Sequence, residues 1–170
     1  MRKHLAFAGF ATALLMLAPP AVASADKPEP RVSGSMSGTL PKEFGPWAGE
    51  PVKFTINAHG RPAGVKGTFK VFHDRIDGSK PVGDFEGKIT CLAVAGEVAV
   101  ATGVITKGYV NILDKPTEDV TGKKVSFTVH DNGRDDRIFW IWEFMGAPVN
   151  DCQGTAPAFK PARGDFTIRG

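Results

Sequence analysis

The sequence predicts an all-β protein in which about eight strands form an antiparallel meander and close as a small β-barrel. Three observations support this fold class. Apolar and polar residues alternate with a period of two, 20 glycines and 13 prolines suit many tight turns, and no stretch of ten or more residues beyond the N-terminal segment has an apolar stripe at helical spacing. A two-sheet β-sandwich is the alternative, because periodicity alone does not separate the two architectures.

Residues 1–25 have the pattern of a secretory signal peptide. A charged start precedes an apolar run over residues 5–17, and Ala23 and Ala25 place small residues where a signal peptidase cleaves. The run is shorter than the ~20 residues that span a bilayer, so we expect no membrane attachment of the mature chain. We expect cleavage after Ala25 and secretion, into the extracellular space, of a single all-β domain over residues 26–170.

Eight segments of the mature chain show strand patterning. In the second of them Val52, Phe54 and Ile56 alternate with polar neighbours, which is typical of a strand with one buried face. The sixth shows the same alternation, with Val125, Phe127 and Val129 on its apolar face. Short turn-forming groups such as residues 77–81 favour antiparallel pairing, and pairing of the first strand with the last would remove exposed sheet edges. In chain order, the expected strands are residues 32–40, 52–59, 65–73, 84–92, 97–106, 124–130, 137–144 and 165–169.

The charge balance argues against several classes of partner. Removal of the signal peptide would leave 19 Lys and Arg against 18 Asp and Glu, spread along the chain. Binding of nucleic acid or an anionic membrane would require a clustered basic face. We therefore expect neither partner, and we expect a monomer with one core, since about 145 residues suffice to bury one.

Cys91 and Cys152 are the only cysteines of the chain. A lone pair in an exported protein predicts a disulfide, because the compartment is oxidising. Closing so long a loop would stabilise the fold by roughly 4 kcal/mol in the chain-entropy model. The bond would also anchor the proline-containing segment 147–162.

Candidate metal ligands are scattered. His59, His73 and His130 each end a predicted strand, but alternation places only His73 on an apolar side, and no His-x-His spacing is present. The acidic turn 131–136 lacks the spacing of a calcium loop, and its Asn-Gly step predicts a hairpin turn with positive φ angles. We therefore expect surface or turn-capping histidines, no metal site and no cofactor.

The seventh predicted strand is apolar on both faces. Trp140 and Trp142 share one face, while Phe139 and Ile141 occupy the other. The second face is either covered by the segment that carries Cys152 or open as an aromatic strip, and large open apolar patches are uncommon on monomers. We favour the covered arrangement, and these four residues are the candidate contacts to a ligand or partner.

Motifs of known catalytic chemistry are absent from the sequence. It contains no Gly-x-Ser-x-Gly elbow, no phosphate-binding Gly-x-x-x-x-Gly-Lys-Ser/Thr loop and no Gly-x-Gly-x-x-Gly dinucleotide motif. No catalytic residue is assigned, and an enzyme is the less favoured interpretation.

Three segments carry a resemblance: FEGKITCL at 85–92, AVATGVI at 99–105 and GKKVSFTVHDNG at 122–133. They resemble a recurring pattern in small exported proteins of high-GC Gram-positive bacteria, mostly uncharacterised and sometimes labelled repetin-like. The resemblance covers about residues 83–170. It implies a secreted β domain with the same two-cysteine arrangement, and it brings no activity or catalytic residues.

Two hypotheses for function follow. The first is a secreted, non-enzymatic binding module that holds a small apolar ligand or a partner protein. The second is a small β-barrel enzyme, cyclase or dirigent-like, whose cavity shapes a reactive substrate. A buried cavity that contains a histidine or carboxylate would favour the enzyme, whereas a filled core with an exposed aromatic face would favour the binding module.

Overall fold

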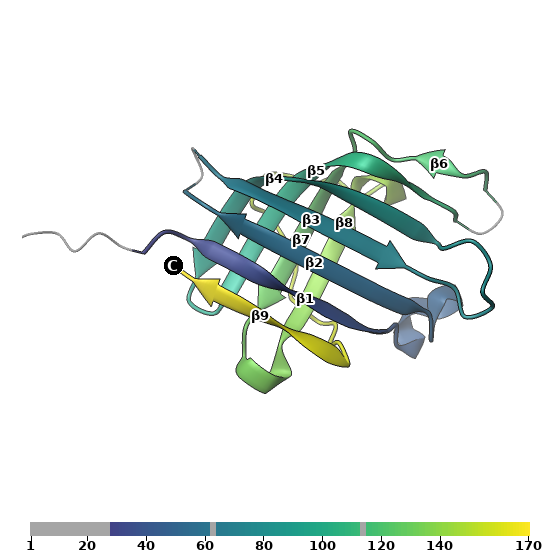
Figure 1. Ribbon diagram of the computed structural model, residues 1–170, viewed down its shortest axis with the longest axis horizontal. Helices are drawn as coiled ribbons and strands as arrows, with labels where there is room; N and C mark the ends of the chain where they lie inside the picture. Colours follow the sequence, from purple (N-terminus) through teal and green to yellow (C-terminus); the bar gives the residue numbers. More distant parts are fainter. Residues whose placement is uncertain (1–27, 62–63, 113–114) are drawn as a thin grey trace, which may run out of the picture.

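The computed structural model describes residues 28–61, 64–112 and 115–170 (Figure 1). The predicted signal peptide lies outside these residues. Within them, no helix is long and apolar enough to cross a membrane. The elements in chain order are β1 (Arg31–Thr39), η1 (Lys42–Trp47), β2 (Pro51–His59), β3 (Lys66–His73), β4 (Gly83–Ala95), β5 (Val98–Val110), β6 (Glu118–Asp119), β7 (Lys124–His130), η2 (Gly133–Asp135), β8 (Arg137–Trp142), η3 (Glu143–Met145) and β9 (Arg163–Arg169), where η denotes a 3₁₀ helix.

The strands form one antiparallel sheet in the order β8-β7-β5-β4-β3-β2-β1-β9, with β6 paired to the end of β5. Figure 1 shows that the sheet curls into a half-barrel. The strands turn through 251° in all. The first strand pairs with the last over seven residues, as predicted. The sheet therefore curls on itself as predicted, instead of splitting into the two sheets of the alternative sandwich, but it stops at a half-barrel, so the expected removal of both sheet edges was wrong.

All eight expected strands are present, with ends that differ from the expected ones by up to four residues. The expected strand 137–144 ends at Trp142, because residues 143 and 144 belong to the 3₁₀ helix η3. β4 and β5 each extend to 13 residues, because they form a long hairpin that turns at Gly96, whose φ of 59° is accessible to glycine. β5 therefore continues into the expected break after Thr106. The two-residue strand β6 carries no period-two pattern and was not predicted.

The inner face of the half-barrel holds the hydrophobic core. Its largest fully buried side chains include Phe54 on β2, Phe127 on β7 and Phe166 on β9. The ring of Phe69 lies directly against Gly87 on β4, where a Cβ atom would come within 2.4 Å of it. Glycine at this position therefore lets an aromatic ring pack against the strand backbone.

A disulfide joins Cys91 on β4 to Cys152, as predicted, and holds the segment after η3 against the outer face of the sheet. The Ser126 hydroxyl donates a 2.6 Å hydrogen bond to the Gln153 carbonyl, and the Cys152 N–H donates to the Thr102 hydroxyl at 3.2 Å. This segment buries the outer polar residues of β7, so the expectation that β7 has only one buried face was wrong.

The two edge strands, β8 and β9, do not pair with each other. Ile138 on β8 exchanges two main-chain hydrogen bonds with Phe159, at 2.9 and 3.0 Å, which covers part of the β8 edge. The Asp131 carboxylate accepts a 2.9 Å hydrogen bond from the Ile168 N–H on β9. The acidic turn thus supplies a hydrogen-bond acceptor to a main-chain N–H on the exposed edge of β9.

The conformation of this turn differs from the prediction. Asn132 has a φ of −125°, so the predicted turn with positive φ at both Asn and Gly was wrong, and only Gly133 has a positive φ.

Candidate ligand cavity

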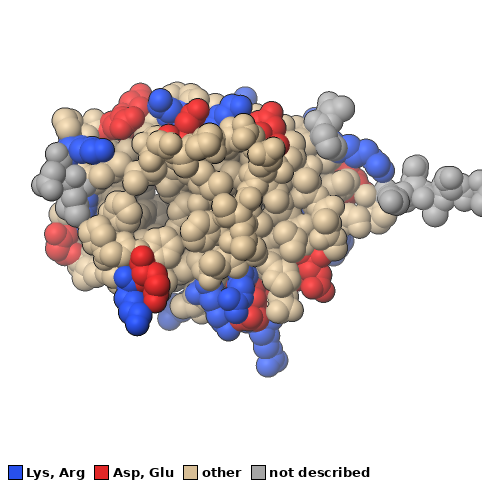
Figure 2. Space-filling model, turned by 180° about the vertical axis from the view of Figure 1, so that it is seen from behind, with Lys and Arg blue, Asp and Glu red and all other residues tan. Residues whose placement is uncertain are grey.

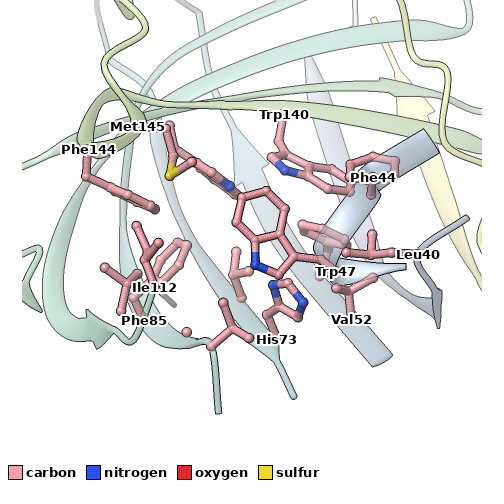
Figure 3. Close-up of a pocket in the computed structure, with 16 residues that line it drawn as sticks. Leu40, Phe44, Trp47, Val52, His73, Phe85, Ile112, Trp140, Phe144 and Met145 are labelled. Atoms are coloured by element: carbon pink, nitrogen blue, oxygen red, sulfur yellow. The ribbon is translucent and has the colours of Figure 1, made fainter. Parts of the chain in front are cut away.

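A cavity of about 120 Å³ lies at one end of the half-barrel, enclosed by the inner sheet face, η1 and η3 (Figure 3). Its walls come from seven elements: β2, β3, β4, the end of β5, β8 and the two short helices η1 and η3. Figure 2, in which the molecule is seen from behind, shows a broad face with few charged side chains and a hollow toward one end, with most charges along its margins. The surroundings of the cavity are therefore mainly uncharged.

Aromatic rings make up much of the cavity wall. The centroids of Phe54 and Trp140 are 4.5 Å apart, and those of Phe85 and Trp142 are 5.2 Å apart in an edge-to-face arrangement. Phe44 on η1 stacks on Trp140 at 5.6 Å. These contacts fix the rings in place, because offset and edge-to-face pairs at such separations are mutually attractive.

The strand β8 divides the four predicted contact residues between two environments. Its alternation turns Trp140 and Trp142 into the cavity, where both rings form part of the wall. Phe139 and Ile141 lie on the opposite face, paired with Thr128 and Ser126 of β7, and are half-buried. The segment that carries Cys152 lies on this same outer face, where the Ser126 hydroxyl donates a hydrogen bond to the Gln153 carbonyl.

A polar group borders the otherwise apolar cavity. His73, at the end of β3, pairs in register with Val52 of β2, and its imidazole lines the cavity wall. Its Nε2 lies 2.8 Å from Oε2 of Glu50, and the other oxygen of Glu50 lies 3.7 Å from the Arg75 guanidinium. The side chains of all three residues are at most 16% exposed.

Burial controls the protonation of this group. Loss of solvent around His73, with a smaller effect of the nearby Arg75 charge, lowers the pKa of His73 to about 4. Burial likewise raises the pKa of Glu50, against an opposing effect of Arg75. His73 is therefore a neutral imidazole at neutral pH, and its two nitrogens offer one donor and one acceptor.

Trp47, the last residue of η1, also lines the cavity. The backbone holds it there: the Glu50 N–H donates to the Trp47 carbonyl at 3.1 Å, and Leu40 and Gly49 close the loop with a 2.7 Å hydrogen bond. In Figure 3 the nitrogen edge of the Trp47 indole is turned toward the His73 imidazole. The indole nitrogen is buried and has no hydrogen-bond partner among the residues that the structure describes.

The three strand-end histidines do not come together. His59 lies 3.4 Å from Glu29, and His130 lies 3.8 Å from Glu97, both on the surface. The expectation of a surface or turn-capping role was wrong for His73, which faces the cavity as its place on the apolar side of β3 indicated. Within the described residues, no group of three His, Cys, Asp or Glu side chains could hold a metal ion.

Trp47 and Phe44, which line the cavity, and Glu50, which lies 2.8 Å behind His73, were not predicted from the sequence. Glu50 lies two residues before Val52, so it continues the pattern in which every second residue of β2 is buried. Extending that pattern by two residues toward the N-terminus would have predicted that Glu50 points inward. Trp47 and Phe44 lie on a short 3₁₀ helix, whose position follows from loop hydrogen bonds and leaves no periodic pattern in the sequence.

Comparisons with protein-family models, with curated protein sequences and with solved structures found no match to this chain.

Proposed function

We propose that this protein is an exported binding module that holds a small, ring-sized apolar molecule in the cavity of its half-barrel. Export is supported by the sequence pattern of residues 1–25 and by the disulfide, a bond typical of oxidising compartments. Binding is supported by a single observation, the preformed cavity of about 120 Å³ walled by aromatic and aliphatic side chains.

The size of the cavity limits the ligand. An engineered apolar cavity of ~150 Å³ in another protein holds one benzene molecule, whereas sites for drug-sized ligands occupy ~300 to 1,000 Å³. A cavity of about 120 Å³ therefore suits a single six-membered ring. The aromatic wall favours such a ring, because it offers both faces and edges for stacking.

Titration with toluene tests the proposal. We expect saturable quenching or enhancement of tryptophan fluorescence, since Trp140 and Trp142 both form part of the cavity wall, and a rise in the thermal midpoint with toluene concentration. Ile112→Trp should abolish both effects, because this half-buried residue lines the cavity and a larger ring would fill it.

The matched control is Ile168→Trp, the same substitution at a partly buried residue of β9 that is not part of the cavity wall. This variant should bind toluene as the wild type does. Absence of saturable binding in the folded wild type, or equal binding by both variants, would contradict the proposed function.

A second candidate function is a cavity enzyme of the cyclase or dirigent-like kind. One observation favours it: the cavity wall contains His73, with the Glu50 carboxylate 2.8 Å behind it. Neutral His73 could accept a proton from a carbon next to a ligand carbonyl and return it to another atom.

Deuterium exchange tests the enzyme candidate. Incubation with cyclohexanone in D₂O should place deuterium next to the carbonyl faster than the buffer alone, and His73→Gln should remove the acceleration. An exchange rate equal to that of the buffer would exclude this proton transfer and leave the binding module.

A further inference from the structure

We infer that the ligand of the cavity carries one hydroxyl group on its ring, as a phenol or a cyclic alcohol does. This inference rests on the proposed function and adds the polar part of the ligand to it. It comes from the polar atoms that border the cavity, which the apolar wall alone does not explain.

Within residues 28–61, 64–112 and 115–170, three buried polar side-chain atoms around Trp47 and His73 lack a hydrogen-bond partner: Trp47 Nε1, His73 Nε2 and Glu50 Oε2. Although Nε2 and Oε2 are 2.8 Å apart, their orientation does not meet hydrogen-bond geometry. Buried polar atoms are nearly always paired in folded proteins, because an unpaired one costs about 1 to 3 kcal/mol. Such atoms beside a cavity indicate a partner that enters it.

Each of these atoms constrains the chemistry of that partner. The indole N–H of Trp47 can only donate, so the partner must present an acceptor. The Glu50 carboxylate, when ionised, can only accept, so the partner must also present a donor. A hydroxyl group is both donor and acceptor in a single atom.

Charged alternatives fit less well. A ligand carboxylate would be placed near the Glu50 carboxylate, and like charges repel at this range. A ligand ammonium would offer no acceptor to Trp47 Nε1, and the Arg75 guanidinium lies 3.7 Å from Glu50. A neutral hydroxyl group avoids both conflicts and matches the size of the cavity when attached to one ring.

Phenol and toluene, which differ by a hydroxyl in place of a methyl group, provide the test. We expect phenol to bind wild type at least about tenfold more tightly than toluene, because a site that hydrogen-bonds a hydroxyl discriminates against analogues that lack it. Trp47→Phe keeps an aromatic ring but removes the donor, so it should lower the affinity for phenol and leave that for toluene nearly unchanged.

The matched control is Trp142→Phe, the same change at a wall residue whose nitrogen is not among the unpaired buried atoms. It should alter the two affinities by similar factors. Toluene binding as tightly as phenol, or a preference for phenol that survives Trp47→Phe, would overturn the inference while the proposed function stands. If neither compound binds the folded wild type, the proposed function itself fails.

Discussion

The carboxylate of Asp136 accepts a 2.8 Å hydrogen bond from the main-chain N–H of Phe166, across the gap between the two edge strands. Its other oxygen accepts a 2.8 Å hydrogen bond from the Asn132 N–H. Asp136 precedes β8 and Phe166 lies on β9, so this buried side chain joins the turn before one sheet edge to the backbone of the other. Hydrogen bonds to this carboxylate thus connect the two edges of the half-barrel, which do not pair with each other.

Asp136→Ala should destabilise the protein by about 3 kcal/mol, because two hydrogen bonds to a charged acceptor are lost and the Phe166 N–H is left buried without its partner. Urea unfolding measures the change. The control is Asp151→Ala, which removes an exposed carboxylate 3.5 Å from Lys124 and should cost less than about 1 kcal/mol. Equal effects of the two substitutions would contradict the role given to Asp136.

Acid should weaken the fold through His73. Its folded pKa of about 4 lies below the usual 6.5, so the unfolded chain binds more protons between these values, and stability falls as the pH drops through that window. Between pH 7 and pH 5 this effect amounts to about 2 kcal/mol. Glu50 acts in the opposite sense, since its raised pKa favours the folded state at low pH.

The difference between wild type and His73→Gln isolates this contribution. The variant should lose less stability than wild type between pH 7 and pH 5, as urea unfolding at each pH would show. His59→Gln, at a histidine whose side chain is 51% exposed, serves as the control and should follow wild type. A His73→Gln variant with the full acid dependence would exclude His73 as its source.

Cys152→Ser should lower the free energy of unfolding by about 2 to 5 kcal/mol, because the bond from Cys91 closes a loop with a sequence separation of 61 residues. Release of the segment should also expose apolar surface on the outer face of β8, including Phe139 and Ile141. A hydrophobic dye should therefore bind the folded variant more strongly than wild type. Strong dye binding by fully folded wild type would contradict the covered arrangement.

Cleavage of the exported protein should follow Ala25, because small residues at 23 and 25 fit the signal peptidase. N-terminal sequencing of the protein from culture medium should read Asp26-Lys27-Pro28. A start upstream of Ala21, or full retention in the membrane fraction, would contradict this expectation.

The sequence was sufficient to predict the strands and their approximate order. Alternation along a strand is a local property, so Val125, Phe127 and Val129 are buried in the core as expected. The disulfide followed from cysteine count and compartment. Ser126 lies on the outer face of β7 and is nevertheless buried. This could not be predicted from the alternation, because the segment that covers Ser126 lies about 27 residues further along the chain.

The cavity was less accessible to sequence reasoning. The inward direction of Trp140 followed from the β8 pattern, and that of His73 from the β3 pattern. Their neighbours Trp47 and Glu50 belong to a loop whose path is set by its own hydrogen bonds, and the 2.8 Å approach of Glu50 to His73 requires the register of β2 with β3. Such contacts between distant segments leave no local pattern.

The most direct measurement for the cavity is a crystal structure of the protein soaked in bromobenzene, with the bromine located by anomalous scattering. We expect one dominant bromine peak inside the cavity, between the Trp140 and Phe85 rings, and the loss of that peak in Ile112→Trp. An empty cavity in wild type, or bromine bound only on the outer face, would contradict the claim that this half-barrel binds ring-sized apolar molecules.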